Sequence, residues 1–307
     1  MMSFPNLFIV GAPKSGTTSL YHYLKQHPDI CIPNKEPRYF IKESILSVSE
    51  KDPIKPYLLR SSILDEKAYC TLYKDKVEKI VCDSSTQYLF HYNEVIPKLK
   101  ALKHEPKILI LLRNPIERAF SNYQHNLSTF ENLSFNDALN NEQQRIDQKF
   151  NSFWYYKHLS LYSDQVLAYQ KEFKSVKVVF FENFINDING TLSDIYEFLE
   201  IDSSFAHSNF MVNTKSTGVP KRRWVNSLLR YVSGLSFLKN TFYSLFGKEK
   251  TKLIREIVMR KNLTKSKNGI DDDVRLKLES FFLDDINKLK EVLPLHNVNW
   301  LNDGKNS

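Results

Sequence analysis

The chain has 307 residues, of which 42% are hydrophobic and 25% charged, so it is long enough to bury a core and has a globular composition. Its formal net charge of +8 indicates an anionic partner: a nucleotide, an acidic glycan, a nucleic acid or a membrane surface. Three cysteines without metal-ligand spacing argue against a disulfide framework or a metal centre and favour reduced thiols.

No stretch reaches the roughly 18 uninterrupted apolar residues of a membrane span. No basic segment of the signal-peptide type precedes the first predicted strand, which begins by Leu7. We therefore expect a cytoplasmic protein without a transmembrane segment.

The first predicted strand leads into a turn and then a helix. An apolar run at residues 7–10 meets a turn that contains glycine, proline, lysine and serine, and a helical pattern covers residues 17–27. Backbone N–H groups of such a turn point inward, and the helix start adds its positive end, so this layout predicts a site for a phosphate-like anion. The spacing from Gly11 to Gly16 fits the first half of the P-loop motif G-x-x-x-x-G-K-[ST]. The second half fails, because Thr17 follows Gly16 and the only lysine, Lys14, lies inside the loop.

The remaining elements alternate along the chain. Short apolar runs predict strands at residues 30–32, 80–82, 107–112 and 176–182. Helical patterns occur at residues 93–103, 131–151, 154–173, 188–199 and 272–293. This alternation predicts an α/β fold, with a P-loop-like parallel β-sheet flanked by helices on both faces.

We expect one domain over residues 1–307, because no repeat or low-complexity linker divides the chain. Residues 224–247 are apolar-rich and are expected to form a helical insertion packed on the core, in preference to a peripheral membrane contact. Residues 272–300 are expected to form a closing helix and tail, with Leu276 and Phe281 among the helix's apolar positions.

Four polar segments directly follow predicted strands, at residues 11–18, 35–40, 83–86 and 113–121. Ligands of parallel sheets bind at the carboxyl ends of the strands, so these segments are expected to form one site. Arg113 can bind a phosphate bidentately, and Ser121 lies within the next predicted helix, where it can reach the same phosphate.

These segments resemble those of a known family. The run PKSGTT at residues 13–18 resembles the 5′-phosphosulfate loop of sulfotransferases that use 3′-phosphoadenosine 5′-phosphosulfate (PAPS). Residues 112–123 resemble that family's 3′-phosphate segment, and KEPRYF at residues 35–40 is similar to the strip with the catalytic glutamate in its heparan-sulfate and bacterial glycan branch. The donor-binding residues that this resemblance implies are Pro13, Lys14, Ser15, Gly16, Thr17, Thr18, Arg113 and Ser121, with Lys221 and Arg222 in a loop that closes over the 3′-phosphate.

The resemblance also implies a mechanism. PAPS donates its sulfuryl group to an acceptor hydroxyl or amine and leaves adenosine 3′,5′-bisphosphate, with no metal required. Lys14 is expected to neutralise charge on the leaving phosphate, and Glu36 is the candidate general base. Lys35 contacts either the donor or an acidic acceptor, and Asp83 either binds a sugar hydroxyl or assists the base. The substrate-binding candidates are Lys35, Arg38, Asp83 and Ser84.

Two alternatives stay open at this stage. One is an ATP-dependent small-molecule kinase, in which Asp83 at a strand end would hold Mg²⁺ and Arg113 would be dispensable. The other is a nucleotide- or polyanion-binding protein without catalysis, in which Glu36 would have no role. The sequence favours a PAPS-dependent sulfotransferase that acts on a carbohydrate or glycan, with no nucleic-acid partner. Two departures from the family pattern bear on the acceptor: Arg38 replaces a histidine common in heparan-type members, and residues 83–88 replace a Lys-Thr-Pro-Ser-Tyr strip.

Overall fold

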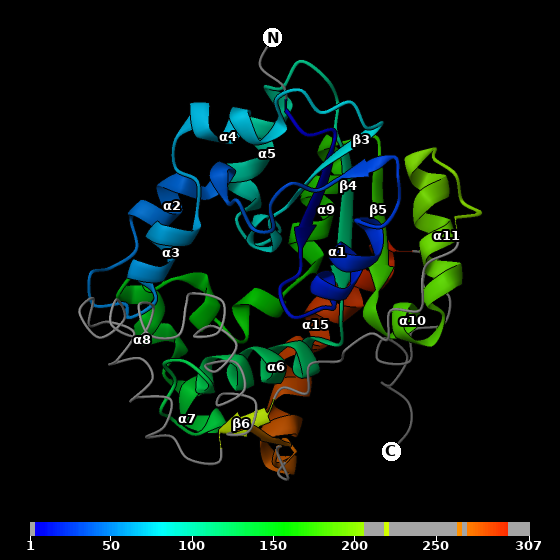
Figure 1. Ribbon diagram of the computed structural model, residues 1–307. Helices are drawn as coiled ribbons and strands as arrows, with labels where there is room; N and C mark the ends of the chain where they lie inside the picture. Colours follow the sequence, from blue (N-terminus) through cyan, green and yellow to red (C-terminus); the bar gives the residue numbers. More distant parts are fainter. Residues whose placement is uncertain (1–3, 206–217, 221–262, 266–268, 294–307) are drawn as a thin grey trace, which may run out of the picture.

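The computed structural model describes residues 4–205, 218–220, 263–265 and 269–293. Within these residues, five strands form one sheet in the order β2-β3-β1-β4-β5, and every neighbouring pair is parallel (Figure 1). The strands are β1 (Leu7–Gly11), β2 (Ile30–Cys31), β3 (Ile80–Ser84), β4 (Lys107–Leu112) and β5 (Val176–Phe180). The predicted α/β class with a parallel sheet is confirmed.

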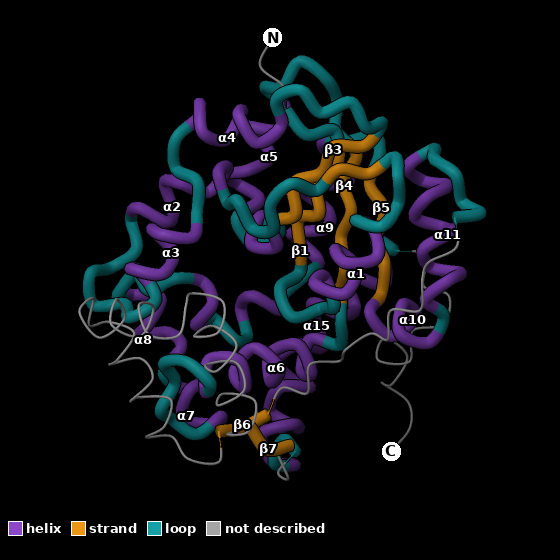
Figure 2. The backbone as a smooth tube through the Cα atoms, viewed as in Figure 1, coloured by secondary structure: helices purple, strands orange, loops and turns teal. Residues whose placement is uncertain are grey.

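Helices precede and follow the strands along the chain. They are α1 (Thr17–Leu24), α2 (Lys42–Leu46), α3 (Lys55–Ser61), α4 (Glu66–Tyr73), α5 (Tyr92–Lys100), α6 (Pro115–Leu127), α7 (Phe135–Asn140), α8 (Glu142–Asp147), α9 (Ser163–Glu172), α10 (Phe181–Asn186), α11 (Ile188–Leu199) and α15 (Asp272–Val292). A short antiparallel ribbon of β6 (Gly218–Pro220) and β7 (Leu263–Lys265) lies near α6 (Figure 2).

Side chains of the central strand β1 alternate between two cores. Leu7 and Ile9 pack with residues of α1 and α11, whereas Phe8 and Val10 pack with residues of α5 and α9. Successive side chains of a strand point to opposite faces, so an uninterrupted apolar run serves both cores at once. All five residues of β1 are buried, which confirms that helices cover both faces of the sheet.

The pattern over residues 154–173 predicted one helix, and its first half is wrong. Two 3₁₀ turns, η3 (Ser152–Trp154) and η4 (His158–Ser160), precede α9. Buried carboxylates bind the backbone and side chains here: Asp52 accepts from the Trp154 indole at 3.0 Å, and Glu142 accepts from the N–H groups of Lys157 and His158 at 2.9 Å each. The two Glu142 bonds occupy backbone N–H groups that a continuous helix would pair internally.

Helix α15 confirms the predicted closing helix but not its whole apolar face. Leu278 and Phe282 are buried, whereas Leu276 is 63% exposed and Phe281 is 40% exposed. The predicted insertion at residues 224–247, the tail beyond residue 293 and the pair Lys221 and Arg222 lie outside the described residues. Among the described helices, none has the length and apolar character needed to cross a membrane.

Candidate active site

The turn between β1 and α1 is the predicted anion cradle, and its backbone can be described directly. Helix α1 begins after Gly16, whose φ is +86°, and no side chain of the described residues caps its start. The Ser19 and Leu20 amides already donate hydrogen bonds to the Gly16 carbonyl, at 3.0 and 3.1 Å. The earlier amides of the turn and helix start are the groups that an anion at a helix N-terminus uses.

The predicted cradle residues differ in exposure. Pro13, Ser15 and Thr17 are buried, Lys14 is half-buried and Thr18 is exposed. Gly11, at the end of β1, is closely packed: a Cβ atom there would lie 2.4 Å from the Leu89 Cβ atom. The cradle therefore combines a tightly packed base with an accessible rim.

Arg113 lies against this cradle, in line with the expectation that segments directly after the strands meet at one edge of the sheet. Its Nη1 atom donates to the Lys14 carbonyl at 3.3 Å, and its guanidinium lies 4.8 Å from the centre of the Phe181 ring. The same ring lies beside Gly16, since a Cβ atom on Gly16 would be 2.6 Å from Phe181 Cδ2. Phe181 thus packs between the two predicted phosphate subsites, a role that its sequence position after β5 did not reveal.

Helix α6 carries Ser121 and is rigidly held. Asn114 caps it by accepting from the Ile116 and Glu117 amides, and Ser121 itself is only 7% exposed. Arg118 is fully buried and donates to Ser160 Oγ at 2.5 Å and to the Tyr156 carbonyl at 2.7 Å. Arg118 therefore fastens the helix that presents Ser121, and burial lowers the pKa of Arg118 to about 10.

Glu36 is held at the carboxyl end of β3. Its amide donates to the Ser84 carbonyl at 2.9 Å. Its carboxylate accepts from Thr86 Oγ1 at 2.7 Å and from the Thr86 amide at 3.2 Å, and lies 3.4 Å from Arg38 Nε. The side chain is 17% exposed, so the carboxylate is oriented by protein donors and still reaches solvent. Thr86 is a partner that sequence reasoning missed, because it lies 50 positions from Glu36.

Lys35 connects the Glu36 strip to the cradle. Its ammonium donates to Thr18 Oγ1 at the start of α1 and lies 5.9 Å from the centre of the Tyr21 ring. This position places a positive charge at the exposed rim of the cradle. Of the two roles that the sequence left open for Lys35, contact with the donor is the one that this placement favours.

Asp83 and Ser84 lie at the same edge but inside the protein. Both are fully buried, so neither side chain is exposed to an acceptor in this structure. Burial raises the pKa of Asp83 to about 6, against the opposing effect of hydroxyl donors from Ser85, Tyr69 and Tyr88. In the described parts of the chain, no three His, Cys, Asp or Glu side chains gather closely enough to hold a metal ion.

His125 is a further residue beside the cradle that the sequence analysis overlooked, since the charge of Lys14 acts on it. It lies four residues after Ser121 on α6, hence on the same side of the helix, and its surface is exposed. The pKa of His125 is lowered, chiefly because surrounding protein removes solvent from the imidazole and secondly because of the charge of Lys14. The i,i+4 spacing from Ser121 is the signal that identifies it.

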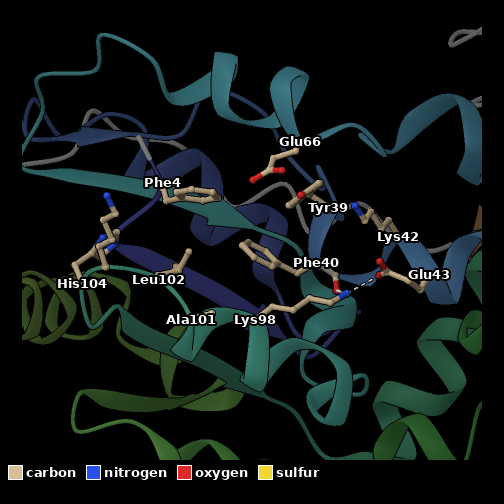
Figure 3. Close-up of a pocket in the computed structure, with 11 residues that line it drawn as sticks. Phe4, Tyr39, Phe40, Lys42, Glu43, Glu66, Lys98, Ala101, Leu102 and His104 are labelled. Carbon is tan, nitrogen blue, oxygen red and sulfur yellow. Dashed lines mark hydrogen bonds and ion pairs between the residues drawn. The ribbon is translucent and has the colours of Figure 1, made fainter. Parts of the chain in front are cut away.

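A separate cavity of about 550 Å³ lies away from the cradle (Figure 3). Phe4, Tyr39 and Phe40 provide its aromatic wall, with Lys42 and Lys98 among its charged groups. It adjoins the segments that lead into β1 and β4, at the amino ends of these strands. None of the described residues that line it belongs to the cradle or to residues 113–121.

The fold is a P-loop-like α/β sheet, and the turn after β1 lies beside Arg113, while Thr86 orients the Glu36 carboxylate at the end of β3. The profile of the sulfotransferase family matches residues 5–205. The chain belongs to this family, which confirms the resemblance seen in its motifs.

Similar proteins agree with this assignment. The human heparan sulfate glucosamine 3-O-sulfotransferase 3B1 is 24% identical over 224 residues, covering 70% of this chain and 51% of the relative. The human 3-O-sulfotransferase 6 is 23% identical over 218 residues, covering 68% and 56%. The chain thus spans about half the length of the curated relatives it matches. A crystal structure of a sulfotransferase from Alicyclobacillus acidocaldarius is 30% identical and superposes with a TM-score of 0.72, covering 97% of this chain and 99% of that one.

Proposed function

We propose that the protein transfers the sulfuryl group of PAPS to a hydroxyl or amine of a carbohydrate or glycan acceptor. The observation that carries the proposal is the contact between Arg113 and the cradle turn, through the Lys14 carbonyl at 3.3 Å. This contact places a guanidinium fork beside an anion cradle, so that two phosphate groups of one nucleotide can be held together. ATP has no 3′-phosphate for such a fork, whereas PAPS has one.

The chain's own residues supply the binding and the acid–base chemistry. Residues 13–18 bind the 5′-phosphosulfate, Arg113 and Ser121 bind the 3′-phosphate, and Lys221 and Arg222 are proposed to join them. When bound, PAPS supplies the sulfuryl group. Lys14 stabilises negative charge on the leaving phosphate, and Glu36 accepts the proton of the attacking acceptor group.

The acceptor class rests on similarity and charge. Several relatives bear names of enzymes that act on heparan sulfate, and the net charge of +8 suits an acidic glycan. A cytoplasmic location is part of the proposal, and it is supported by the three described cysteines, all of which are free thiols.

Calorimetry with adenosine 3′,5′-bisphosphate and with ATP–Mg²⁺ tests the donor. We expect tight binding of the bisphosphate, and a loss of about tenfold to a hundredfold in Arg113→Lys, because lysine retains the charge and loses the fork. A preference for ATP–Mg²⁺, with Arg113→Ala tolerated, would support the kinase alternative and overturn the proposal.

Transfer of labelled sulfate from PAPS tests the reaction. The acceptor panel contains heparan sulfate, chondroitin sulfate and small alcohols. Glu36→Gln is expected to abolish transfer with unchanged affinity for the bisphosphate. Glu43→Gln is the matched control, because its carboxylate pairs with Lys98 at 2.5 Å outside the site. Binding without transfer to any acceptor would favour the non-catalytic alternative.

A further inference from the structure

The segment that carries Glu36 has an unfavourable backbone. Glu36 has a φ of 59° and Arg38 a φ of 55°, and neither is glycine. Side chains disfavour this left-handed region, so such residues persist where surrounding contacts hold them. Groups outside the segment must therefore stabilise the conformation that presents the Glu36 carboxylate.

Two buried hydroxyl groups provide such contacts. The Arg38 amide donates to Ser85 Oγ at 2.9 Å, and the Phe40 amide donates to the Tyr88 hydroxyl at 3.2 Å. Both hydroxyls in turn donate to Asp83, Ser85 at 2.7 Å and Tyr88 at 3.1 Å. One buried carboxylate is thus connected to two amides of the strained segment.

The chemistry of Asp83 sets the direction of these bonds. An ionised carboxylate only accepts hydrogen bonds, so both hydroxyl protons point toward it. Each hydroxyl then turns a lone pair toward the segment, where a backbone N–H needs an acceptor. A donor in place of the carboxylate would compete for those lone pairs, and an unpaired buried amide is costly.

We infer that Asp83 is a positioning residue that fixes the conformation of residues 36–40, and with it the Glu36 carboxylate, through the hydroxyls of Ser85 and Tyr88. The catalytic part of this inference rests on the proposed function of Glu36. Because Asp83 is fully buried, its side chain has no exposed surface for a ligand, and the role inferred for it acts through the segment. This assigns a role to the carboxylate that the sequence placed at a strand end.

The chain offers a matched pair of variants. Tyr69 and Tyr88 are both fully buried, and both donate to Asp83 Oδ2, at 2.7 and 3.1 Å. Only the Tyr88 hydroxyl also accepts from the strained segment; among the described bonds, the Tyr69 hydroxyl accepts from none of its amides. A general loss of stability would affect Tyr69→Phe and Tyr88→Phe alike, whereas positioning affects only Tyr88→Phe.

Hydrogen-exchange mass spectrometry on peptides covering residues 36–41 measures the protection of the segment's amides directly. We expect about tenfold faster exchange at the Phe40 amide in Tyr88→Phe, on the scale of one lost hydrogen bond, and no change in Tyr69→Phe. Ser85→Ala removes the acceptor of the Arg38 amide, so faster exchange is expected at that amide. This variant replaces Tyr88→Phe in the experiment if Tyr88→Phe fails to fold. With PAPS and an active acceptor, kcat is expected to fall about tenfold or more in Tyr88→Phe, with KM for PAPS unchanged.

Equal exchange and equal kcat in the Tyr69 and Tyr88 variants would overturn the inference. Failure of the proposed function has a different signature: Glu36→Gln would retain transfer, while the exchange difference between the two tyrosine variants would still appear. In that case Asp83 anchors the segment, and the link to catalysis is wrong.

Discussion

Replacement of Gly16 by alanine probes the cradle and its connection to Arg113. Gly16 has a φ of +86°, and an alanine in this left-handed region destabilises the folded state by about 1–2 kcal/mol. Its Cβ atom would lie 2.6 Å from Phe181 Cδ2 and 2.9 Å from Cε2. The ring must shift, and overpacking of this kind costs about 1–3 kcal/mol. The expected loss in the free energy of unfolding is therefore about 2–5 kcal/mol.

The shift of Phe181 also reaches the second subsite, because the Arg113 guanidinium lies 4.8 Å from the ring centre. We expect urea denaturation to show the loss of stability, and calorimetry to show at least tenfold weaker binding of adenosine 3′,5′-bisphosphate. Gly269→Ala is the control, since a Cβ atom there meets nothing within 4 Å. Unfolding free energies of the two variants within about 0.5 kcal/mol of each other would refute the reasoning.

Three further outcomes are expected. Burial raises the pKa of Asp83 to about 6, so the folded protein binds its proton more readily than the unfolded chain, and this group's contribution to stability falls as pH rises from about 4 to 6. In denaturation at several pH values, the free energy of unfolding of the wild type should fall by about 3 kcal/mol relative to that of Asp83→Asn between pH 3.5 and 7. A pH-independent difference between the two free energies would contradict this. Glu131→Gln should cost about 3–5 kcal/mol in denaturant, because Glu131 pairs with the buried Arg145 at 2.7 and 3.0 Å; a loss below about 1 kcal/mol would show the pair to be dispensable. Lys35→Gln should weaken binding of adenosine 3′,5′-bisphosphate severalfold, because the Lys35 ammonium lies at Thr18; an effect only on acceptor KM would assign it to the acceptor.

Local sequence patterns predicted much of this fold. The run at residues 107–112 matches β4 residue for residue, and Pro115 begins α6 as expected from its fixed φ. The cradle turn was predictable too, because its glycines and the following helix are contiguous in the chain. Such features depend on propensity and periodicity over a few residues, which the sequence contains directly.

The partners of the site residues depended on tertiary structure. Strand order places Arg113 beside the cradle, 99 positions after Lys14. Thr86 orients Glu36 across 50 positions, and Phe181 fills the space between Gly16 and Arg113. No local pattern encodes these contacts, because they arise only when parallel strands distant in sequence end at one edge of the sheet.

Asp83 shows the difference most directly. The sequence determined that a carboxylate stands where β3 ends, at the edge where ligands of such sheets bind. Tertiary packing decided that this carboxylate is buried beneath Tyr69 and Tyr88. Because of this burial, Asp83 accepts hydrogen bonds from internal hydroxyls and has no exposed surface to meet a substrate. An enclosed carboxylate must find its hydrogen-bond donors within the protein.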